Sequence, residues 1–403
     1  MHCVSVLSRP NLADAAVVVP SSRRSASGLW VSTVPLRRMR ALQQAESSAP
    51  LQSSSVRRRF ELFPRIVAAL AALFLCLPSA ASARDVTDSA GRKVQIPDRI
   101  DRVMAAGPPA SALLYVLAPE KMIGWNLKPR EADLPYLSTA VRDLPEIGRL
   151  TGRGNTANLE TVMAAKPDVI IDFGSVSATY VSLADRVQNQ TGIPYLLVDG
   201  RFDNTVNALR MLGSIFDVSD RAERLAWRTQ EILDEVGQVA GSVSEKQHPR
   251  VYLARRANGL ETGNRGSINT EIIERAGGVN VVDTERSGGG LVNVSLEQVL
   301  RWNPNTIVTT DRNFAGQARA MSAWADVDAV RRGRIFVSPS LPYGWIDSPP
   351  SINRILGLQW LAQLFFPDKF QSDIRDETRG FYKLFYHVDL SDPQLNRLLE
   401  GAK

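Results

Sequence analysis

"NLETVMAAKPDVII" (residues 158–171) and "SLEQVLRWNPNTIV" (residues 295–308) are two versions of one stretch of sequence, and they decide the fold. Both versions place Leu, Glu, Val and Pro at the same offsets, and both end in a run of apolar and β-branched residues. Glu160 and Glu297 occupy equivalent positions, near the start of each stretch. A chain that repeats one stretch in this way predicts two related halves.

The residues around each repeated stretch predict a short helix followed by a buried strand. Asn158 and Ser295 are residue types that cap helix N-termini, and Ser295 with Gln298 fits a capping box. Pro167 and Pro304 disfavour helix at the residue before them, so each helix ends there. Each Glu then lies in the first helical turn, where a carboxylate also complements the helix dipole.

Strand-like runs alternate with helical patterns on both sides of these stretches, after a short hairpin at residues 84–97 that turns at Ala90 and Gly91. Such alternation is typical of an α/β fold with mostly parallel sheets. The runs form two series, which predict two Rossmann-like lobes. The first series is 102–106, 121–125, 168–173 and 195–198, and the second is 250–255, 280–282, 305–310 and 334–338.

A single long helix is predicted between the two series. Its apolar residues recur at helical spacing, and Ser219 is a suitable N-cap before Asp220. A rigid connection of this kind predicts a small hinge motion when ligand binds in the cleft between the lobes. The predicted divisions are a leader at 1–83, a first α/β lobe at 84–215, a bridging helix at 216–246, and a second α/β lobe with C-terminal helices at 247–403.

The leader reads as an export signal. Several Arg residues precede the apolar run 66–77, and small residues follow up to Ala83. This order is typical of a secretory signal peptide, and the run is too short for a membrane span. Cys3 and Cys76, the two cysteines, both lie in this leader. We therefore expect a periplasmic protein without disulfides, with lipid attachment at Cys76 as the less favoured alternative.

The charge of the chain also divides at the leader. Residues 1–83 hold ten Arg against Asp14, Glu46 and Glu61, which leaves 48 − 10 = 38 basic and 42 − 3 = 39 acidic groups in the body. A nearly neutral body gives no support for nucleic-acid binding. We expect no nucleic-acid partner.

The chain resembles the Fe/B12-type, or class III, periplasmic substrate-binding proteins of ABC importers, which deliver ferric siderophores, haem or cobalamin. The resemblance covers about residues 84–385. It rests on the repeated stretches, the bridging helix, "ETGNRGSINTEIIERAGGVNVV" (261–282) and the pattern from Trp324 to Val337. In such proteins one surface Glu on each lobe docks to Arg pockets of the permease dimer, and Glu160 and Glu297 match those positions.

The loops after the strands should face the ligand cleft, since open α/β sheets bind ligands beyond the carboxyl ends of their strands. These loops carry aromatic and Arg residues that suit a bulky anionic metal chelate, and a ferric siderophore is the expected ligand. The candidate ligand-binding residues are Trp125, Arg149, Arg256, Arg265, Arg312, Phe314, Tyr343 and Trp345, and Asp347 with Arg354 is expected to form a structural pair.

A compact oxyanion such as molybdate or tungstate is the alternative ligand, held by backbone N–H groups where helices follow Gly107–Ser111 and Gly174–Ser175. No resident cofactor and no metal site are expected, because His248 and His387 are the only histidines of the body and lie outside these loops.

Two enzyme classes compete with the binding-protein interpretation. Residues 152–157 fit the dinucleotide pattern G-x-G-x-x-A, which would indicate an NAD-dependent oxidoreductase, but the convincing strand follows this motif instead of preceding it. A hydrolase would need a histidine beside a nucleophile, and no nucleophile-elbow sequence is present. The sequence therefore predicts a monomeric binding protein with no catalytic residues.

Overall fold

The computed structural model describes residues 83–152, 154, 156–284 and 290–402 of the chain. All of them fall in one compact unit, Ser79–Lys403. The predicted signal peptide, Cys3 and Cys76 lie outside the described residues. Within the described part of the chain, no helix is both long and apolar enough to cross a membrane.

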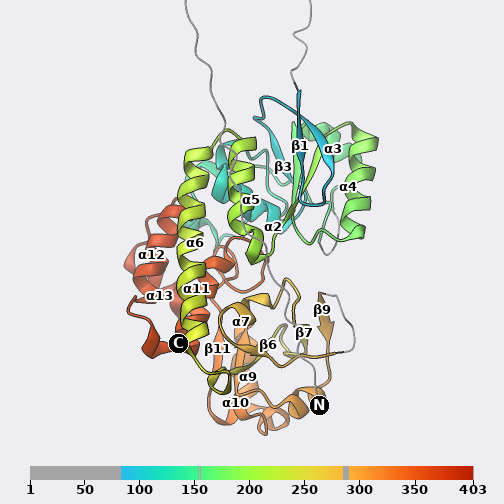
Figure 1. The fold of residues 1–403 in the computed structure, drawn as a ribbon. Coiled ribbons are helices and arrows are strands. Elements are labelled where there is room, and N and C mark those ends of the chain that lie inside the picture. The colour runs from blue at the N-terminus through green and yellow to red at the C-terminus, as the bar shows by residue number, and fades with distance from the viewer. Residues whose placement is uncertain (1–82, 153, 155, 285–289, 403) are drawn as a thin grey trace, which may run out of the picture. The chain divides into compact units, whose positions relative to one another are not determined.

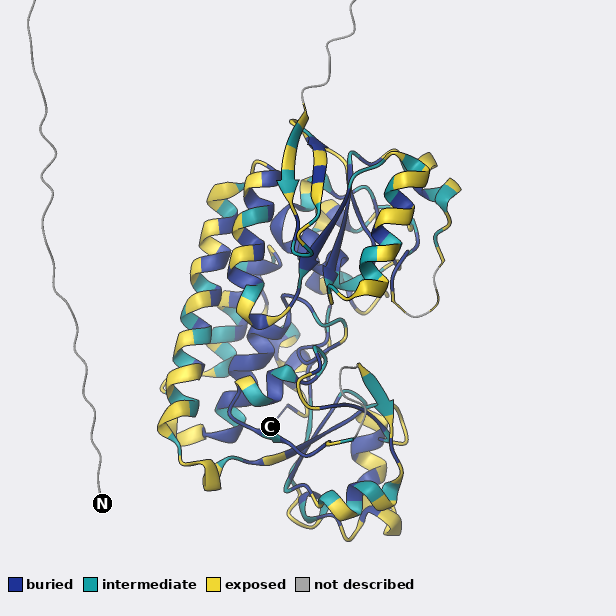
Figure 2. Cartoon of the chain, turned by 45° about the vertical axis from the view of Figure 1, so that its right-hand side comes forward, coloured by how far each residue is buried: buried dark blue, intermediate teal, exposed yellow. Residues whose placement is uncertain are grey.

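The first lobe is built on a parallel sheet of strand order β3-β4-β5. All of β3 and nearly all of β4 are buried, as the dark sheet in Figure 2 shows, because helices pack against these strands. The predicted hairpin is confirmed as the antiparallel pair β1 and β2. The strands are β1 (Ala83–Thr87), β2 (Lys93–Pro97), β3 (Val103–Ala105), β4 (Val169–Gly174) and β5 (Tyr195–Asp199).

Helices and short turns connect the strands of this lobe. Residues 121–125, predicted as a strand, form only isolated parallel bridges, from Met122 to Val103 and from Trp125 to Glu146. The helices are α2 (Pro108–Leu117), α3 (Leu159–Ala165), α4 (Ala178–Thr191) and α5 (Phe202–Ile215), with 3₁₀ turns at Pro119–Lys121, Leu134–Tyr136 and Thr139–Val141.

The predicted bridging helix is present as α6 (Ser219–Ser242), which runs beside α5 and α11 in Figure 1. Its buried side follows the helical spacing read from the sequence, with Leu225, Ile232 and Val236 in the core. The N-cap is Val218 and its side chain makes no cap hydrogen bond, so the expectation that Ser219 caps this helix was wrong. A 3₁₀ turn at Glu245–Gln247 leads into the second lobe.

The second lobe repeats the plan with a parallel sheet of order β11-β10-β6-β8. A small antiparallel pair, β7 with β9, was not predicted. The elements are β6 (Arg250–Ala254), β7 (Glu261–Gly263), α7 (Glu271–Arg275), β8 (Val279–Asn280), β9 (Leu291–Asn293), α8 (Leu296–Trp302), β10 (Thr306–Thr309), α9 (Arg312–Ala320), a 3₁₀ turn (Ser322–Trp324), α10 (Asp328–Arg331) and β11 (Ile335–Val337). The expected fold of two α/β lobes with mostly parallel sheets is confirmed.

Three C-terminal helices complete the core that joins the two lobes: α11 packs on α6, α12 packs on α11, and α13 packs on α12. The largest cluster of buried apolar residues runs from Leu113 in α2 through Leu225 in α6 and Leu361 in α11 to Val251 in β6. These helices are α11 (Arg354–Phe365), α12 (Ile374–Phe385) and α13 (Asp392–Leu399), with a 3₁₀ turn at Pro367–Lys369.

A buried Arg links the lobes where α11 begins. Arg354 is 1% exposed, donates to Gly200 O (2.6 Å) and Ile268 O (2.7 Å), and pairs with Glu271 (2.8 Å). Its guanidinium lies 4.4 Å from the centroid of the Phe202 ring. One cation therefore bonds to both lobes, in a region where an unpaired charge would be costly.

The expected pair between Asp347 and Arg354 is not formed, because each residue has another partner. Asp347 is buried and its carboxylate binds the Arg255 guanidinium of the second lobe, while Arg354 turns to Glu271. A further ion pair between the lobes joins Arg275 to Asp203.

Candidate functional site

Helices α3 and α8, which come from the repeated stretches, have matching N-termini. Asn158 Oδ1 accepts from the backbone N–H of Thr161 at 2.8 Å. Ser295 Oγ accepts from the N–H of Gln298 at 3.3 Å, and Gln298 Oε1 accepts in return from the N–H of Ser295 at 2.9 Å. The predicted caps and capping box are confirmed.

The two Glu residues occupy the same helical position and are both exposed. Glu160 and Glu297 are each the second residue of their helix, and neither is drawn into the core. A hydrogen bond with the Ser295 side chain lowers the pKa of Glu297. The Glu297 carboxylate is therefore charged at neutral pH, and both Glu side chains are accessible to a cationic partner.

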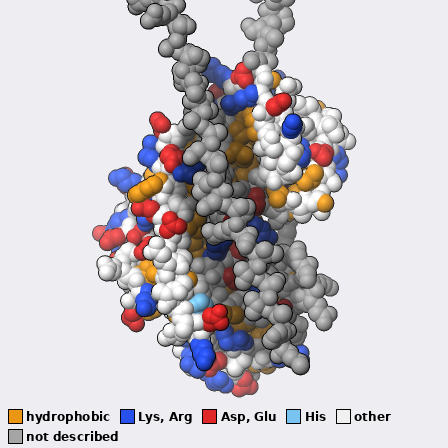
Figure 3. Space-filling view, in the orientation of Figure 1, with side chains coloured by type: hydrophobic (Ala, Val, Ile, Leu, Met, Phe, Trp, Pro, Cys, Tyr) orange, Lys and Arg blue, Asp and Glu red, His pale blue; other side chains and the backbone are white. Residues whose placement is uncertain are grey.

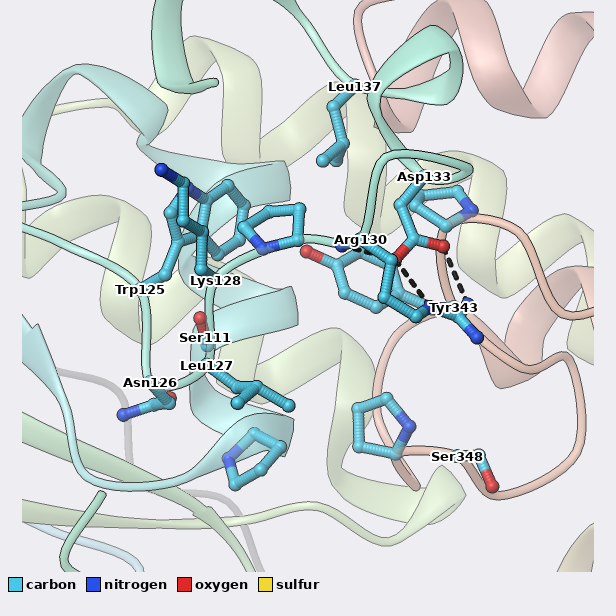
Figure 4. A pocket seen from close by; sticks show the side chains of 14 residues that line it. Ser111, Trp125, Asn126, Leu127, Lys128, Arg130, Asp133, Leu137, Tyr343 and Ser348 are labelled. Atoms are coloured by element: carbon cyan, nitrogen blue, oxygen red, sulfur yellow. Dashed lines mark hydrogen bonds and ion pairs between the residues drawn. The ribbon is translucent and has the colours of Figure 1, made fainter. Parts of the chain in front are cut away.

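A cavity of about 210 Å³ lies between the first lobe and the segment that follows β11 (Figure 4). Its walls come from the start of α2, from the loop after the Met122 bridge, and from the segment before α11, as expected for loops beyond strand ends. The lining residues are Pro108, Ser111, Trp125, Asn126, Leu127, Lys128, Pro129, Arg130, Asp133, Leu137, Pro342, Tyr343, Ser348 and Pro349.

The wall at the start of α2 depends on a close approach. A Cβ atom on Gly107, the N-cap of α2, would lie 2.2 Å from Thr151 Oγ1, so a larger residue would push this helix away. The first two helical residues, Pro108 and Pro109, have no N–H group. The α2 backbone therefore offers fewer donors for an oxyanion than we expected, and side chains must supply more of them.

Three polar side-chain atoms at the cavity are buried without a hydrogen-bond partner in the described part of the chain. They are Ser111 Oγ, Asn126 Oδ1 and Tyr343 Oη. The Asn126 amide is oriented by Nδ2, which donates to Ala105 O (2.7 Å) and Gly148 O (2.9 Å), so Oδ1 is an acceptor. Buried polar groups in proteins are nearly always bonded, so unpaired atoms around one cavity call for an explanation.

One cation at the cavity is unpaired, and another is neutralised. Arg130 makes two hydrogen bonds to the Asp133 carboxylate, at 2.9 and 2.7 Å. Lys128 is exposed, and among the described residues its ammonium group has no ion-pair partner; only its backbone N–H is held, by Glu146 at 3.1 Å. Among the described charged side chains that line the cavity, Lys128 is therefore the one whose charge is not neutralised by an ion pair.

Trp125 and Tyr343 are the predicted ligand residues that the structure brings together at the cavity. Trp125 is 3% exposed and its Nε1 donates to Val141 O at 2.8 Å, which fixes the indole. Tyr343 is held by the rings of Tyr115 and Tyr386, with centroids 6.4 and 5.8 Å away. Each places a rigid aromatic side chain in the wall.

The four predicted Arg residues do not line this cavity. Arg149 Nε donates to Gly154 O at 3.0 Å within its own loop, and Arg265 Nη2 donates to Asn280 O at 2.9 Å. Arg256 lies 3.3 Å from the Glu261 carboxylate, and Arg312 Nη2 donates to Glu400 O at 2.9 Å. Each guanidinium is bound by its own lobe.

Phe314 and Trp345 were expected to offer flat faces to the cleft, and that expectation is corrected. Phe314 is 1% exposed and packs edge-on against Trp324 in the core of the second lobe. Trp345 is 0% exposed and packs edge-on against Trp360 of α11. Both rings fill apolar interior space.

Sequence reasoning named the correct loops at the cavity but missed their polar side chains. Four polar residues of these segments were not singled out: Ser111, which the structure places at the start of α2, and Asn126, Lys128 and Arg130 in the loop after the Met122 bridge. Only their position could have identified these residues from the sequence, since each follows a predicted strand. Ser and Asn are common in such segments, so the residue type alone gives no indication of ligand binding.

A buried carboxylate on β4 lies outside the cavity wall. Asp172 accepts from Thr151 Oγ1 and Tyr195 Oη, both at 3.2 Å, and burial raises its pKa to about 6. The equivalent residue of the second repeat is Thr309, which is buried and donates to Ala254 O at 2.8 Å. The two strands thus carry different polar groups at one position.

Comparison with known proteins identifies relatives with the same architecture. The chain is similar to an ABC transporter solute binding protein from Sulfurospirillum deleyianum, with a TM-score of 0.72 and 31% identity, covering 79% of this chain and 99% of that one. It is 27% identical to the molybdate-binding protein MolA of Haemophilus influenzae over 77% of this chain and 93% of that protein. A vitamin B12-binding protein of Salmonella choleraesuis is 30% identical over 38% of this chain and 56% of its own length.

The first of these relatives is named as a solute binding protein of an ABC transporter and the other two are named as binding proteins, which confirms the resemblance and supports a binding protein over the two enzyme classes. The family model for periplasmic binding proteins matches residues 123–341, more than half of the chain. That match includes both repeated stretches and α6. The chain belongs to the periplasmic binding protein family.

Proposed function

We propose that this protein binds a compact oxyanion, of the molybdate and tungstate class, and presents it to the permease of an ABC importer. The observation that carries the proposal is the small cavity with an unpaired cation and unpaired hydroxyl groups at its wall. Export by the N-terminal leader would place the protein in the periplasm with its permease.

The size of the cavity favours the oxyanion over the ferric siderophore expected from the sequence. Sites for drug-sized ligands, a class that includes siderophores, span about 300–1,000 Å³. The cavity of about 210 Å³ is smaller, yet it is ample for a tetrahedral anion. The four Arg residues expected to hold a chelate are also bound within their own lobes, and two of the four expected aromatic residues, Phe314 and Trp345, are buried away from the cavity.

The charge at the cavity favours an anion. Arg130 and Asp133 neutralise each other, and Lys128 adds one ammonium group to the wall. An ammonium group and hydroxyl donors together are suited to a small oxyanion. The similarity to a protein named for molybdate binding, over most of both chains, supports the same class of ligand.

Glu160 and Glu297 are proposed to dock the protein onto the two halves of the permease. Their exposure and their equivalent positions on α3 and α8 give each lobe one acidic contact. Charged groups at an interface rim mainly steer and orient the partner. A protein with two related lobes can in this way match a two-fold symmetric permease.

Isothermal titration of the purified protein tests the ligand class. Molybdate and tungstate are titrated separately, with a ferric hydroxamate siderophore and sulfate as comparisons. We expect a dissociation constant on the order of micromolar or tighter for an oxyanion, and no heat with the siderophore. Tighter binding of the siderophore would replace the oxyanion by the chelate as the ligand.

Trp125 provides a second readout because its indole forms part of the wall. Intrinsic fluorescence should change when the oxyanion binds, and most of that change should disappear in Trp125→Phe. Trp227→Phe is the matched control, since Trp227 is 60% exposed on α6 and does not line the cavity.

A further inference from the structure

We infer that the hydroxyl groups of Ser111 and Tyr343 are the hydrogen-bond donors that hold the ligand, one from α2 and one from the segment before α11. This inference rests on the proposed function and deepens it, because it names the groups that select an oxygen-rich anion. Two observations support the inference: both hydroxyl groups belong to residues that line the cavity, and neither has a hydrogen-bond partner among the described residues.

Ser111 lies on the first turns of α2, at the wall of the cavity. The residue is 5% exposed, and its Oγ has no hydrogen-bond partner in the described part of the chain. A buried hydroxyl left unpaired costs about 1–3 kcal/mol. Such a cost is expected at a binding site, where the ligand provides the missing partner.

Tyr343 reaches the cavity from the segment between β11 and α11, far from Ser111 in the sequence. In Figure 4 its ring extends from the segment of Ser348 toward the side chains of Trp125 and Lys128. The flanking rings of Tyr115 and Tyr386 restrict its movement. Burial raises the pKa of Tyr343 well above its ordinary value, so the hydroxyl keeps its proton and can donate it to an anion.

A neighbouring tyrosine shows the contrast between a structural and a free hydroxyl. Tyr115 Oη accepts from the N–H of Ser138 at 2.9 Å and donates to the carbonyl of Tyr386. Its hydroxyl is thus fully used within the protein. Among the described residues, the hydroxyls of Tyr343 and Tyr386 in the same aromatic cluster have no hydrogen-bond partner, and of these two residues Tyr343 is the one that lines the cavity.

Asn126 completes the set of unpaired atoms but has the opposite role. Its Oδ1 is an acceptor, which suits an O–H group of a protonated ligand or of a water molecule carried with it. A deprotonated oxyanion gains nothing from this atom. The two hydroxyls, which can donate, are therefore the groups that hold the anion itself.

The experiment compares Tyr343→Phe, Ser111→Ala and the double variant with the unchanged protein. Each protein is titrated with molybdate, tungstate and the ferric hydroxamate, and its melting temperature is measured without ligand. We expect each single variant to bind the oxyanion about tenfold more weakly, and the double variant about a hundredfold. The ligand-free melting temperature should stay the same or rise, because no internal hydrogen bond is lost.

Controls separate this role from packing. Tyr180→Phe and Ser214→Ala remove hydroxyls outside the cavity and should leave affinity unchanged. Tyr115→Phe removes a bonded hydroxyl and should lower the melting temperature, which Tyr343→Phe should not do.

The possible outcomes are distinct. An oxyanion that binds Tyr343→Phe and Ser111→Ala within twofold of the unchanged protein would overturn the inference and leave the proposed function standing. Binding of only the ferric hydroxamate, with loss in both variants, would overturn the oxyanion class and keep the two hydroxyls as ligand donors. An unchanged protein that binds no probe would overturn both.

Discussion

Helices α3 and α8 come from one repeated stretch of sequence, and a comparison of the two separates what both lobes keep from what each lobe changes. Both helices keep a side-chain N-cap, an exposed Glu in the second position, one buried Val and a left-handed C-cap residue. They differ in the cap: only α8 has the reciprocal capping box. The exposed carboxylate thus persists where the local support for the helix has changed, as the proposed docking role requires.

The strands that follow these helices, β4 and β10, differ from each other in the polar residue that they bury at one equivalent position. Asp172 on β4 and Thr309 on β10 are equivalent in the repeat and both buried, but only Asp172 brings an ionisable group into the interior. Both lobes therefore place a small polar side chain at this position, but the side chain can carry a charge only in the first lobe. Each prediction below either breaks the equivalence of the two halves or sharpens the difference between them.

The largest effect should come from removing both carboxylates. Glu160→Ala with Glu297→Ala should reduce ligand transport by the cognate permease in vesicles at least about tenfold, with each single variant intermediate, because each lobe loses its charged contact. Glu245→Ala, at another exposed position, is the control. Normal transport by the double variant with unchanged ligand affinity would show that the repeat has no docking role.

The next largest effect concerns Asp172, whose folded-state pKa of about 6 lies above the ordinary 3.8. Between these two pKa values the native protein therefore binds more protons than the unfolded chain. The stabilising contribution of the protonated Asp172 is fully present below pH 3.8 and is lost as the pH rises through 6. Asp172→Asn should gain up to about 3 kcal/mol relative to the unchanged protein between pH 4 and 7.5. Urea unfolding of both proteins at several pH values measures this gain. Thr309→Val keeps Asp172, so its difference in stability from the unchanged protein should not vary with pH. Parallel stability curves for Asp172→Asn and the unchanged protein would contradict the prediction.

The N-caps should differ by a smaller amount. Asn158→Ala should lower the free energy of unfolding by about 1 kcal/mol, and Ser295→Ala combined with Gln298→Ala should lower it by more, because the combined change removes both bonds of the capping box. Chemical denaturation of both variants gives the comparison. Equal losses would mean that the capping box adds nothing in this protein.

The smallest effect should appear at the C-caps. Lys166 has φ 47° and Asn303 has φ 42°, which places both in the left-handed conformation. This conformation costs more free energy for Lys than for Asn. Lys166→Gly should raise the free energy of unfolding by about 0.5 kcal/mol, and Asn303→Gly should change it little. A loss of stability in Lys166→Gly would show that the Lys side chain compensates for its backbone.

Local patterns in the sequence predicted the elements of the fold, because caps, prolines and helical spacing act over a few residues. Glu160 and Glu297 were placed correctly for the same reason. The cavity was only partly predictable: Trp345 and Phe314 are apolar residues in or beside loops, and nothing local distinguishes a ring that faces ligand from one that packs inward. Ser111 became a candidate only because the structure places its unpaired hydroxyl at the same cavity as Tyr343. The β7–β9 pair was missed because strands of three residues carry no usable alternation.

Arg354 determines how much the two lobes can swing apart. Its guanidinium bonds to Gly200 in the first lobe and to Ile268 and Glu271 in the second, away from water. Rotating the lobes away from each other would break the bond to Gly200, and a hydrogen bond to a charged group contributes about 1.5–3 kcal/mol, which is several times the thermal energy. We therefore expect the lobes of the isolated protein to separate very little. The free energy needed to open them would then come from the ATP-driven transporter, which would also set the time at which the ligand is released.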